Sequence, residues 1–300
     1  RGAVDRYPHL RQFQSQRLKV AGGSRPGPLR VTLIGTGKVL RNEGWITDFD
    51  SPEAKALVGV RHVENTLPDE GLASLDGDTW LCPDSLKAVE RAVGAGLLAV
   101  DEVLADNLDA AFCSVRPPGH HATRSASSGF CVYNNLAIAV RYAQSKGVKR
   151  IAIVDFDVHH GNGTQDIFMD DENVLFCSLF QYPFYPNTAI ENNATLVNSP
   201  LPIASDGNDL KALYDQQWLP KLSAFQPELI FISAGFDAHL EDDMASLKFV
   251  EDDYVWLTEQ LASLSKTLNC KGIISYLEGG YALSALGRSA VAHVKALVDS

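Results

Sequence analysis

Short apolar runs alternate along the chain with longer stretches in which apolar residues recur at helical spacing. The runs predict strands, and the periodic stretches predict amphipathic helices. Because the strands are apolar throughout and are separated by helices, we predict an α/β fold with a mostly parallel central sheet and helices on both faces. The predicted strands are 111–115, 150–156, 174–179, 229–234 and 272–277, and the predicted helices are 82–105, 134–147, 209–225, 252–268 and 282–298.

The region before residue 80 is less regular. Residues 31–37 (VTLIGTG) predict a strand and a glycine turn, but Leu40 replaces the third glycine of a dinucleotide-binding GxGxxG motif, which argues against that function. Residues 20–30 are rich in glycine and proline and predict a loop. We therefore predict a basic N-terminal segment over 1–30 and a single domain over 31–300.

The charge distribution narrows the choice of partners. Basic residues number 26 and acidic residues 37, giving a net charge of −11, which argues against direct nucleic acid binding. Residues 1–30 contain seven basic side chains and one acid, so the remaining 270 residues carry −17. An acidic body favours a cationic substrate. No apolar stretch reaches the roughly 20 residues of a membrane-spanning helix.

The cysteines and the N-terminal segment bear on location. The five cysteines are widely spaced and form no CxxC motif, so we expect reduced thiols and a cytoplasmic protein. The arginine-rich start, which does not begin with Met, leaves organelle targeting open as an alternative.

Four polar clusters each follow a predicted strand directly. They are RPPGHH (116–121), DFDVHHGNG (155–163), GFDAH (235–239) and EGGY (278–281). In parallel sheets ligands bind beyond the carboxyl ends of the strands. We therefore expect the four clusters to meet at one edge of the sheet.

Asp157 and His159 predict a metal site. Side chains two residues apart on an extended segment point the same way, so both can bind one ion, with Asp237 arriving from another strand. Two carboxylates and one imidazole suit zinc and leave a position open. An isolated Asp-x-His is more often a strand-end salt bridge, but the neighbouring clusters favour the metal.

Other polar residues suit acid–base chemistry beside such a metal. Four of the eight histidines form two pairs, and His120 or His121 can transfer protons near neutral pH. Asp155 and Asn162 are candidates for orienting them. The hydroxyl of Tyr281 could donate to a developing oxyanion, although a packed aromatic ring is the alternative.

Five motifs together resemble the zinc-dependent histone deacetylase family, which includes acetylpolyamine amidohydrolases. They are RPPGHHA (116–122), SGFCVYNN (128–135), VDFDVHHGNGTQD (154–166), SAGFDAH (233–239) and LEGGY (277–281), within a resemblance covering about 45–300. The resemblance implies an arginase-like fold and one zinc ion on Asp157, His159 and Asp237. It also implies that His121 is the general base and acid with Asn162 behind it, that His120 is its electrostatic partner with Asp155 behind it, and that Tyr281 polarises the carbonyl.

The resemblance implies further binding residues. Gly129, Phe130 and Tyr185 match the lining of a narrow acyl-lysine tunnel, and Gly279 and Met244 are also assigned to substrate binding. It further implies potassium near the zinc. An inner site would use Ser178 and the backbone of Asp155, Asp157, His159 and Leu179, and an outer site would use Phe168, Asp171 and Val174.

We therefore predict a zinc-dependent amidohydrolase that removes acetyl or related acyl groups from lysine in proteins or peptides. An acetylpolyamine or other small-amide amidohydrolase is the alternative, and a non-catalytic acyl-lysine binding protein is a remote one. Polyamine-selective relatives carry an acidic residue at the position of Met244, so Met244 favours an acyl-lysine substrate. Glu241, Asp242 and Asp243 nevertheless form an acidic turn, so an acetylated polyamine is the alternative substrate. No membrane partner is expected, and a homo-oligomer remains open. Residues 9–20 and 186–189 depart from the family pattern.

Overall fold

A seven-stranded parallel sheet forms the centre of the molecule. The computed structural model describes residues 31–35, 66–188, 190 and 192–300. The strand order is β1-β4-β9-β8-β5-β6-β7, and each neighbouring pair is parallel. The strands are β1 (Val31–Gly35), β4 (Ala110–Ser114), β5 (Ile151–Asp155), β6 (Val174–Gln181), β7 (Leu196–Leu201), β8 (Leu229–Ala234) and β9 (Ile273–Leu277), beside a two-stranded ribbon of β2 (Ala73–Ser74) and β3 (Trp80–Leu81).

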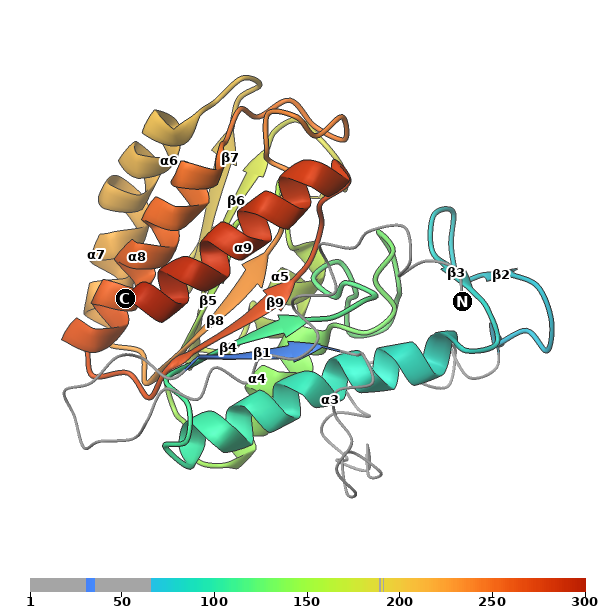
Figure 1. Ribbon diagram of the computed structural model, residues 1–300, viewed down its shortest axis with the longest axis horizontal. Coiled ribbons are helices and arrows are strands. Elements are labelled where there is room, and N and C mark those ends of the chain that lie inside the picture. The colour runs from blue at the N-terminus through green and yellow to red at the C-terminus, as the bar shows by residue number, and fades with distance from the viewer. Residues whose placement is uncertain (1–30, 36–65, 189, 191) are drawn as a thin grey trace.

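Helices cover both faces of this sheet (Figure 1). One face is covered by α3 (Ser85–Leu104), α4 (Asn135–Ser145) and α5 (Asn162–Phe168). The other is covered by α6 (Gly207–Leu213), the π-helical turn η3 (Tyr214–Trp218), α7 (Leu219–Phe225), α8 (Glu251–Thr267) and α9 (Leu283–Asp299).

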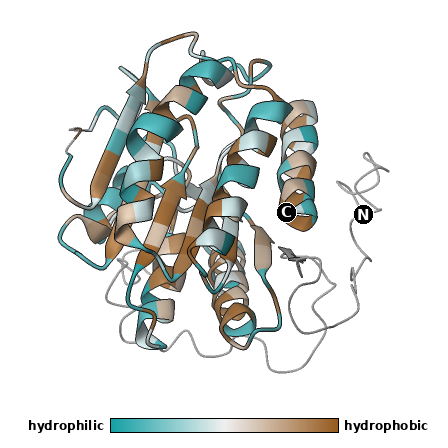
Figure 2. Cartoon of the chain, turned by 90° about the vertical axis from the view of Figure 1, so that its left-hand side faces the viewer, coloured by the Kyte–Doolittle hydropathy of each residue, from teal (hydrophilic) through white to brown (hydrophobic). Residues whose placement is uncertain are grey.

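Successive residues of a strand enter opposite cores. In β5, Ile151 and Ile153 belong to the core under α3 and α4, whereas Ala152 and Val154 belong to the core under α6–α9. This follows from the two-residue period of a strand, and it explains why these strands are apolar on both faces. Figure 2 shows the hydrophobic strands between helices whose hydrophilic sides turn outward.

The structure confirms the α/β class and the five strands predicted after residue 80. The strand at 31–35 is also present. The helix predicted over 209–225 is interrupted by the π-helical turn, and four short elements, β2, β3, α5 and β7, are additional to the prediction. The basic segment 1–30 lies outside the described residues. Within the described part of the chain, no helix is long and apolar enough to cross a membrane.

Because β4, β5, β8 and β9 are parallel neighbours, their carboxyl ends lie at the same edge of the sheet. In the register of the sheet, Asp155 at the end of β5 pairs with Ser233 of β8 on one side and with Ser178 of β6 on the other. The four polar clusters start from this edge, as the sequence predicts.

Candidate active site

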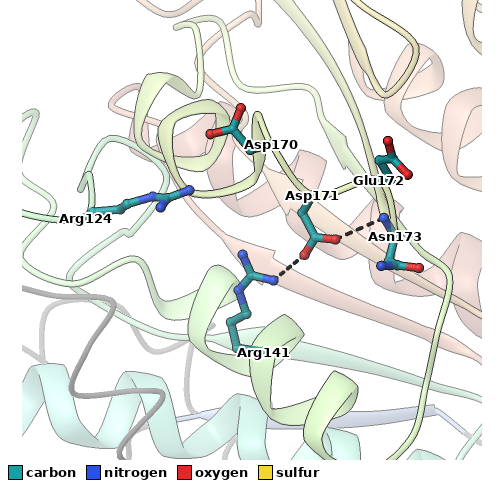
Figure 3. Close-up of a pocket in the computed structure, with 6 residues that line it drawn as sticks. All are labelled: Arg124, Arg141, Asp170, Asp171, Glu172 and Asn173. Carbon is teal, nitrogen blue, oxygen red and sulfur yellow. Dashed lines mark hydrogen bonds and ion pairs between the residues drawn. The ribbon is translucent and has the colours of Figure 1, made fainter.

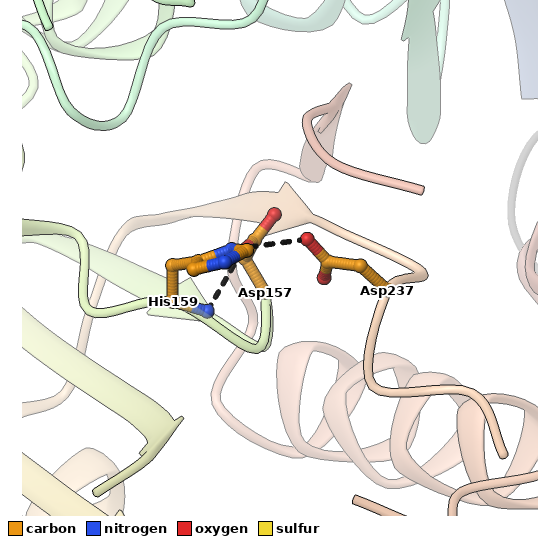
Figure 4. Close-up of side chains that lie close together, drawn as sticks. All are labelled: Asp157, His159 and Asp237. Carbon is orange, nitrogen blue, oxygen red and sulfur yellow. Dashed lines mark hydrogen bonds and ion pairs between the residues drawn. The ribbon is translucent and has the colours of Figure 1, made fainter. Parts of the chain in front are cut away.

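A buried group of two carboxylates and one imidazole lies beyond the ends of β5 and β8 (Figure 4). Asp157 and His159 come from the loop after β5, and Asp237 comes from the loop after β8. Nδ1 of His159 lies 3.0 Å from Oδ1 of Asp157 and 3.1 Å from Oδ2 of Asp237. One ligand atom from each residue falls within 4.8 Å of the others, which is close enough for one metal ion.

Backbone groups fix both carboxylates and leave one oxygen free. The N–H of Val158 donates to Oδ1 of Asp237 at 2.9 Å, and the N–H of Gly279 donates to Oδ2 of Asp157 at 2.9 Å. Oδ2 of Asp237 is buried and accepts no backbone N–H, and it faces Nδ1 of His159 at 3.1 Å. A Cβ on Gly279 would lie 2.2 Å from that oxygen, so only glycine permits this approach. An unsatisfied buried carboxylate oxygen beside a second carboxylate and an imidazole fits a zinc site.

The tandem histidines lie beside this group and have different partners. His120 donates from Nδ1 to Oδ2 of Asp155 at 3.0 Å, and its Nε2 lies 3.7 Å from Asp157. His121 donates from Nδ1 to the amide oxygen of Asn162 at 2.7 Å. Burial lowers the pKa of both rings, but the carboxylates of Asp157 and Asp155 raise the pKa of His120 well above its usual value. Burial and the neighbouring His120 hold the pKa of His121 well below its usual value.

The loop that carries the histidines is held by the start of α5. The N–H groups of Gly163 and Thr164 donate to the carbonyl of His120 at 3.0 and 3.2 Å. The side chain of Asn134 donates to the carbonyl of Ala122 at 3.3 Å and to Thr164 at 3.1 Å. These contacts bring His121 and Asn162 together, although they lie 41 residues apart in sequence.

Glu278 is a buried residue to which sequence reasoning assigned no role. Its Oε2 accepts from the N–H groups of Gly119 and His120 at 2.6 and 3.2 Å, and its Oε1 accepts from the hydroxyl of Ser233 at 3.1 Å. Burial raises the pKa of Glu278 to about 7. The sequence feature that could have indicated a role for Glu278 is its position, since it is a charged residue directly after the apolar strand β9.

Aromatic side chains, two of them partly exposed, lie near the tandem histidines. Phe130 and Tyr281 are 41% and 38% exposed, and their ring centroids are 6.2 Å apart. The ring of Tyr185 lies 5.2 Å from that of His121. Burial raises the pKa of the Tyr281 hydroxyl, so it remains protonated near neutral pH. Phe184, which sequence reasoning missed, stacks on His159 at 5.3 Å.

The loop of Gly129 and Phe130 is held by hydrogen bonds to the turn between β2 and β3. The N–H of Gly129 donates to Asp78 at 3.0 Å, and the N–H of Phe130 donates to the hydroxyl of Thr79 at 3.1 Å. Both residues have positive φ angles, +56° and +65°. The turn between β2 and β3 therefore fixes the backbone of Gly129 and Phe130.

The expected acidic turn does not present three free carboxylates. Asp242 is buried, at 5% exposed, and its carboxylate accepts backbone N–H groups. Glu241 forms an ion pair with Arg288 at 2.6 Å. Asp243 is exposed, and Met244 is 40% exposed.

The residues matched to potassium sites fall in two places. Ser178 pairs with Asp155 in the sheet, and its hydroxyl is buried without a hydrogen bond, which fits a cation at the inner position. Leu179 follows it in β6. At the outer position, the N–H of Asp171 donates to the carbonyl of Phe168, and the N–H of Val174 donates to the carbonyl of Asp171.

A pocket of about 400 Å³ lies at this outer loop and contains none of the predicted catalytic residues. The carboxylate of Asp171 is occupied there by an ion pair with Arg141 (Figure 3). The pocket is lined by Arg124, Arg141, Asp170, Asp171, Glu172 and Asn173.

His160, the fourth paired histidine, takes no part in the metal group. Its Nδ1 lies 3.0 Å from the hydroxyl of Thr188, and its Nε2 lies 3.1 Å from the amide oxygen of Asn198. Its ring packs on Phe180.

Residues 49–297 match the Histone deacetylase domain family. "Type-2 histone deacetylase 2" of Dictyostelium discoideum is 39% identical over 295 residues, which cover 90% of this chain and 17% of that protein. "Polyamine deacetylase HDAC10" of Mus musculus is 37% identical over 265 residues, which cover 83% of this chain and 39% of that protein. The chain thus spans less than half the length of either relative. The crystal structure of the HDA15 HD domain superposes with a TM-score of 0.71 at 34% identity, covering 76% of this chain and 66% of that one.

Proposed function

The chain belongs to the histone deacetylase family, and on that premise we propose that it is a zinc-dependent amidohydrolase that removes acetyl or related acyl groups from lysine side chains of proteins or peptides. The observation that carries the proposal is the convergence of three elements. A buried ligand group, a histidine hydrogen-bonded to a neutral amide and a protonated tyrosine meet at one edge of the sheet. We also propose that residues 31–300 form one catalytic domain.

One zinc ion per chain would be held by Asp157, His159 and Asp237. When bound, zinc supplies a Lewis acid for the acyl carbonyl and increases the acidity of water. The other groups belong to the chain. Nδ1–H of His121 is occupied by Asn162, so Nε2 is left to take a proton from the attacking water and to return it to the departing lysine amine. A histidine whose pKa is low is suited to begin the cycle as a base.

His120 and Tyr281 complete the arrangement. His120, held by Asp155 and close to Asp157, remains protonated and supplies positive charge beside the reacting carbonyl. The hydroxyl of Tyr281 donates to the oxygen on which negative charge develops. Asp155 and Asn162 act through these histidines, each by accepting a hydrogen bond from Nδ1.

The aromatic side chains near the histidines support a lysine side chain as the substrate. Two aromatic faces, Phe130 and Tyr185, suit a four-carbon stem, while Gly129 and Gly279 allow the backbone to come close to the site. Met244 at the rim is uncharged, and two of the three neighbouring acids are occupied within the protein. An acetylated polyamine is the alternative, since one similar relative is named a polyamine deacetylase. A non-catalytic binding protein would have no need of the complete acid–base set.

The test is turnover of an acetyl-lysine peptide, a panel of longer acyl-lysines and N8-acetylspermidine by the zinc-loaded protein. Tyr281→Phe should lower kcat on the peptide by about 10²–10³-fold while zinc remains bound, since it removes one donor to the oxyanion. Near-normal turnover in that variant would refute the role of Tyr281. Turnover of the spermidine alone would favour the polyamine alternative, and binding of both without turnover would favour the non-catalytic one.

We further propose potassium at the inner position, with Ser178, Leu179 and the backbone of Asp155, Asp157 and His159. The outer position would use Phe168, Asp171 and Val174 through backbone carbonyls. For location we propose the cytoplasm, with an organelle as the alternative raised by the basic segment 1–30. Direct partners would be acylated proteins, peptides or polyamines rather than nucleic acid or membrane, and a homo-oligomer remains open.

A further inference from the structure

We propose that Asp242 is a positioning residue that fixes where the Tyr281 hydroxyl lies. The inference rests on the proposed function, because it concerns the tyrosine assigned to the oxyanion. It adds a residue that the sequence places in an ordinary acidic turn. It also assigns Asp242 to catalysis through Tyr281, not to substrate charge recognition at the rim.

The carboxylate of Asp242 joins two loops that come from different strands. Its Oδ2 accepts from the N–H of Tyr281 at 2.6 Å and from the N–H of Ala282 at 2.9 Å. Its Oδ1 accepts from the N–H of Met244 at 3.0 Å. The loop after β8 and the loop after β9 are thus joined through one side chain, which is 5% exposed. A buried carboxylate with three N–H donors resists displacement, because water cannot easily replace them.

Tyr281 needs an anchor of this kind. It follows two glycines, and Gly280 has a φ of +144°, so the preceding backbone has wide conformational freedom. The residue is 38% exposed, so packing alone does not fix it. The first residues of α9 follow at once, and Ala282 at its N-cap provides no side-chain hydrogen bond there. Asp242 instead accepts from the two N–H groups that directly precede the helix, those of Tyr281 and Ala282.

The loop that carries Asp242 is itself held on its far side. Arg288 on α9 pairs with Glu241 and with Glu251 at the start of α8. His239 accepts the N–H of Glu241 at Nδ1 at 3.1 Å, and its Nε2 lies 3.4 Å from Glu251. These contacts make the loop a fixed support from which Asp242 can position the tyrosine.

The experiment is a double-mutant cycle on the zinc-loaded full chain. Asp242→Ala should lower kcat at least about 10-fold with KM within about 2-fold, because even a displacement of about 1 Å in a catalytic group is costly. In a Tyr281→Phe background the same change should lower kcat by less than about 2-fold, because the group it positions is already gone. Equal losses in both backgrounds, or no loss in the unmodified background, would overturn the inference.

Two further variants separate positioning from general damage. Asp242→Asn keeps the size and one acceptor oxygen, so the bonds to Tyr281 and Ala282 can persist, and kcat should recover to within a few-fold of the wild type. If Asp242→Ala does not fold, Asp242→Ser, whose hydroxyl is too short to reach the N–H groups of both Tyr281 and Ala282, takes its place in the cycle with the same expected outcomes. Asp243→Asn removes the same charge from the exposed neighbour and should leave kcat unchanged. A loss there equal to that of Asp242→Ala would show that charge at the rim matters, not the hydrogen bonds.

A binding measurement distinguishes failure of the inference from failure of the proposed function. A hydroxamate presents a carbonyl to Tyr281 without requiring turnover, so calorimetry on the zinc-loaded protein reports the position of the tyrosine directly. Asp242→Ala should weaken hydroxamate binding at least about 5-fold in the Tyr281 protein and less than about 2-fold in the Tyr281→Phe background, with zinc content unchanged. This coupling would stand even if no acylated substrate were hydrolysed. Its absence would overturn the inference even if the enzyme were active.

Discussion

Replacing Gly129 with alanine should disable catalysis through a steric effect on His121. The added Cβ would lie 2.3 Å from Cδ2 of the His121 ring and 2.7 Å from Cγ. Ordinary contacts of such a carbon begin near 3.4 Å, so the ring must move by about 1 Å. A displacement of that size in a catalytic group can cost about 10²-fold in rate. The φ of +56° at Gly129 adds about 1 kcal/mol of backbone strain for an L-residue.

The steric and backbone effects are separable with a matched control. Gly71 has a φ of +74°, but a Cβ built there would meet nothing within 4 Å. Gly71→Ala should therefore lose a similar amount of stability, about 1 kcal/mol, and keep its turnover. Urea denaturation measures the stability of both variants, and kcat on an acetyl-lysine peptide measures the displacement. A Gly129→Ala enzyme within 2- to 3-fold of wild type, or a Gly71→Ala enzyme equally impaired, would refute the reasoning.

Two further predictions concern a buried histidine and the alkali cation. Burial lowers the pKa of His293 to about 3, below the unfolded value of 6.5, so the unfolded chain binds the proton first and stability is lost as pH falls from 6.5 towards 3. By pH 5 the free energy of unfolding should fall by about 2 kcal/mol because of His293. Urea denaturation of His293→Gln should not show this pH-dependent loss. Equal pH dependence of stability in both proteins would contradict the assignment. Replacing potassium by tetramethylammonium should lower the melting temperature and kcat of the wild type. The same replacement should have a smaller effect on both quantities in Ser178→Ala. A wild type whose melting temperature and kcat do not change with the cation would exclude a cation at Ser178.

The hydrogen bonds around His293 agree with a neutral ring. The hydroxyl of Thr258 donates to the carbonyl of Tyr254 at 2.6 Å, so its oxygen is left to accept from Nδ1–H of His293 at 2.7 Å. Nε2 then accepts from the hydroxyl of Ser275 at 2.9 Å. Each nitrogen has the partner that one neutral tautomer needs, and protonation would place a charge in the core under α8 and α9.

The parts of the fold that the sequence predicts are those in which burial determines the pattern. β5 and β8 are buried on both faces, so their apolar runs are unambiguous. β7 was missed because it pairs on one side only and contains Asn198, Ser199 and Pro200, which read as loop residues. α5 is seven residues long and lies within a polar motif, so no helical period can emerge.

The candidate site likewise contains residues that the sequence could bring together and residues that it could not assign. Asp157, His159 and Asp237 could be brought together from sequence because parallel strands place their carboxyl ends at one edge. Asp242 and Glu278 could not be assigned, because their function depends on which backbone N–H groups face them. Asp242 stands in a run of acids typical of a solvated turn, yet it is buried and holds Tyr281. Such residues become visible only when the loops they join are placed in space.

The two adjacent histidines of one loop lie in surroundings that shift their pKa values in opposite directions. Their rings are 4.1 Å apart, so protonation of one disfavours protonation of the other. Their surroundings favour opposite states, because the carboxylates of Asp157 and Asp155 raise the pKa of His120, whereas burial and the neighbouring His120 lower the pKa of His121. The start of α5 holds this asymmetry in place, because it fixes the carbonyl of His120 and carries Asn162 on the same turn. A pair of groups driven to opposite protonation states is what general acid–base chemistry requires near neutral pH.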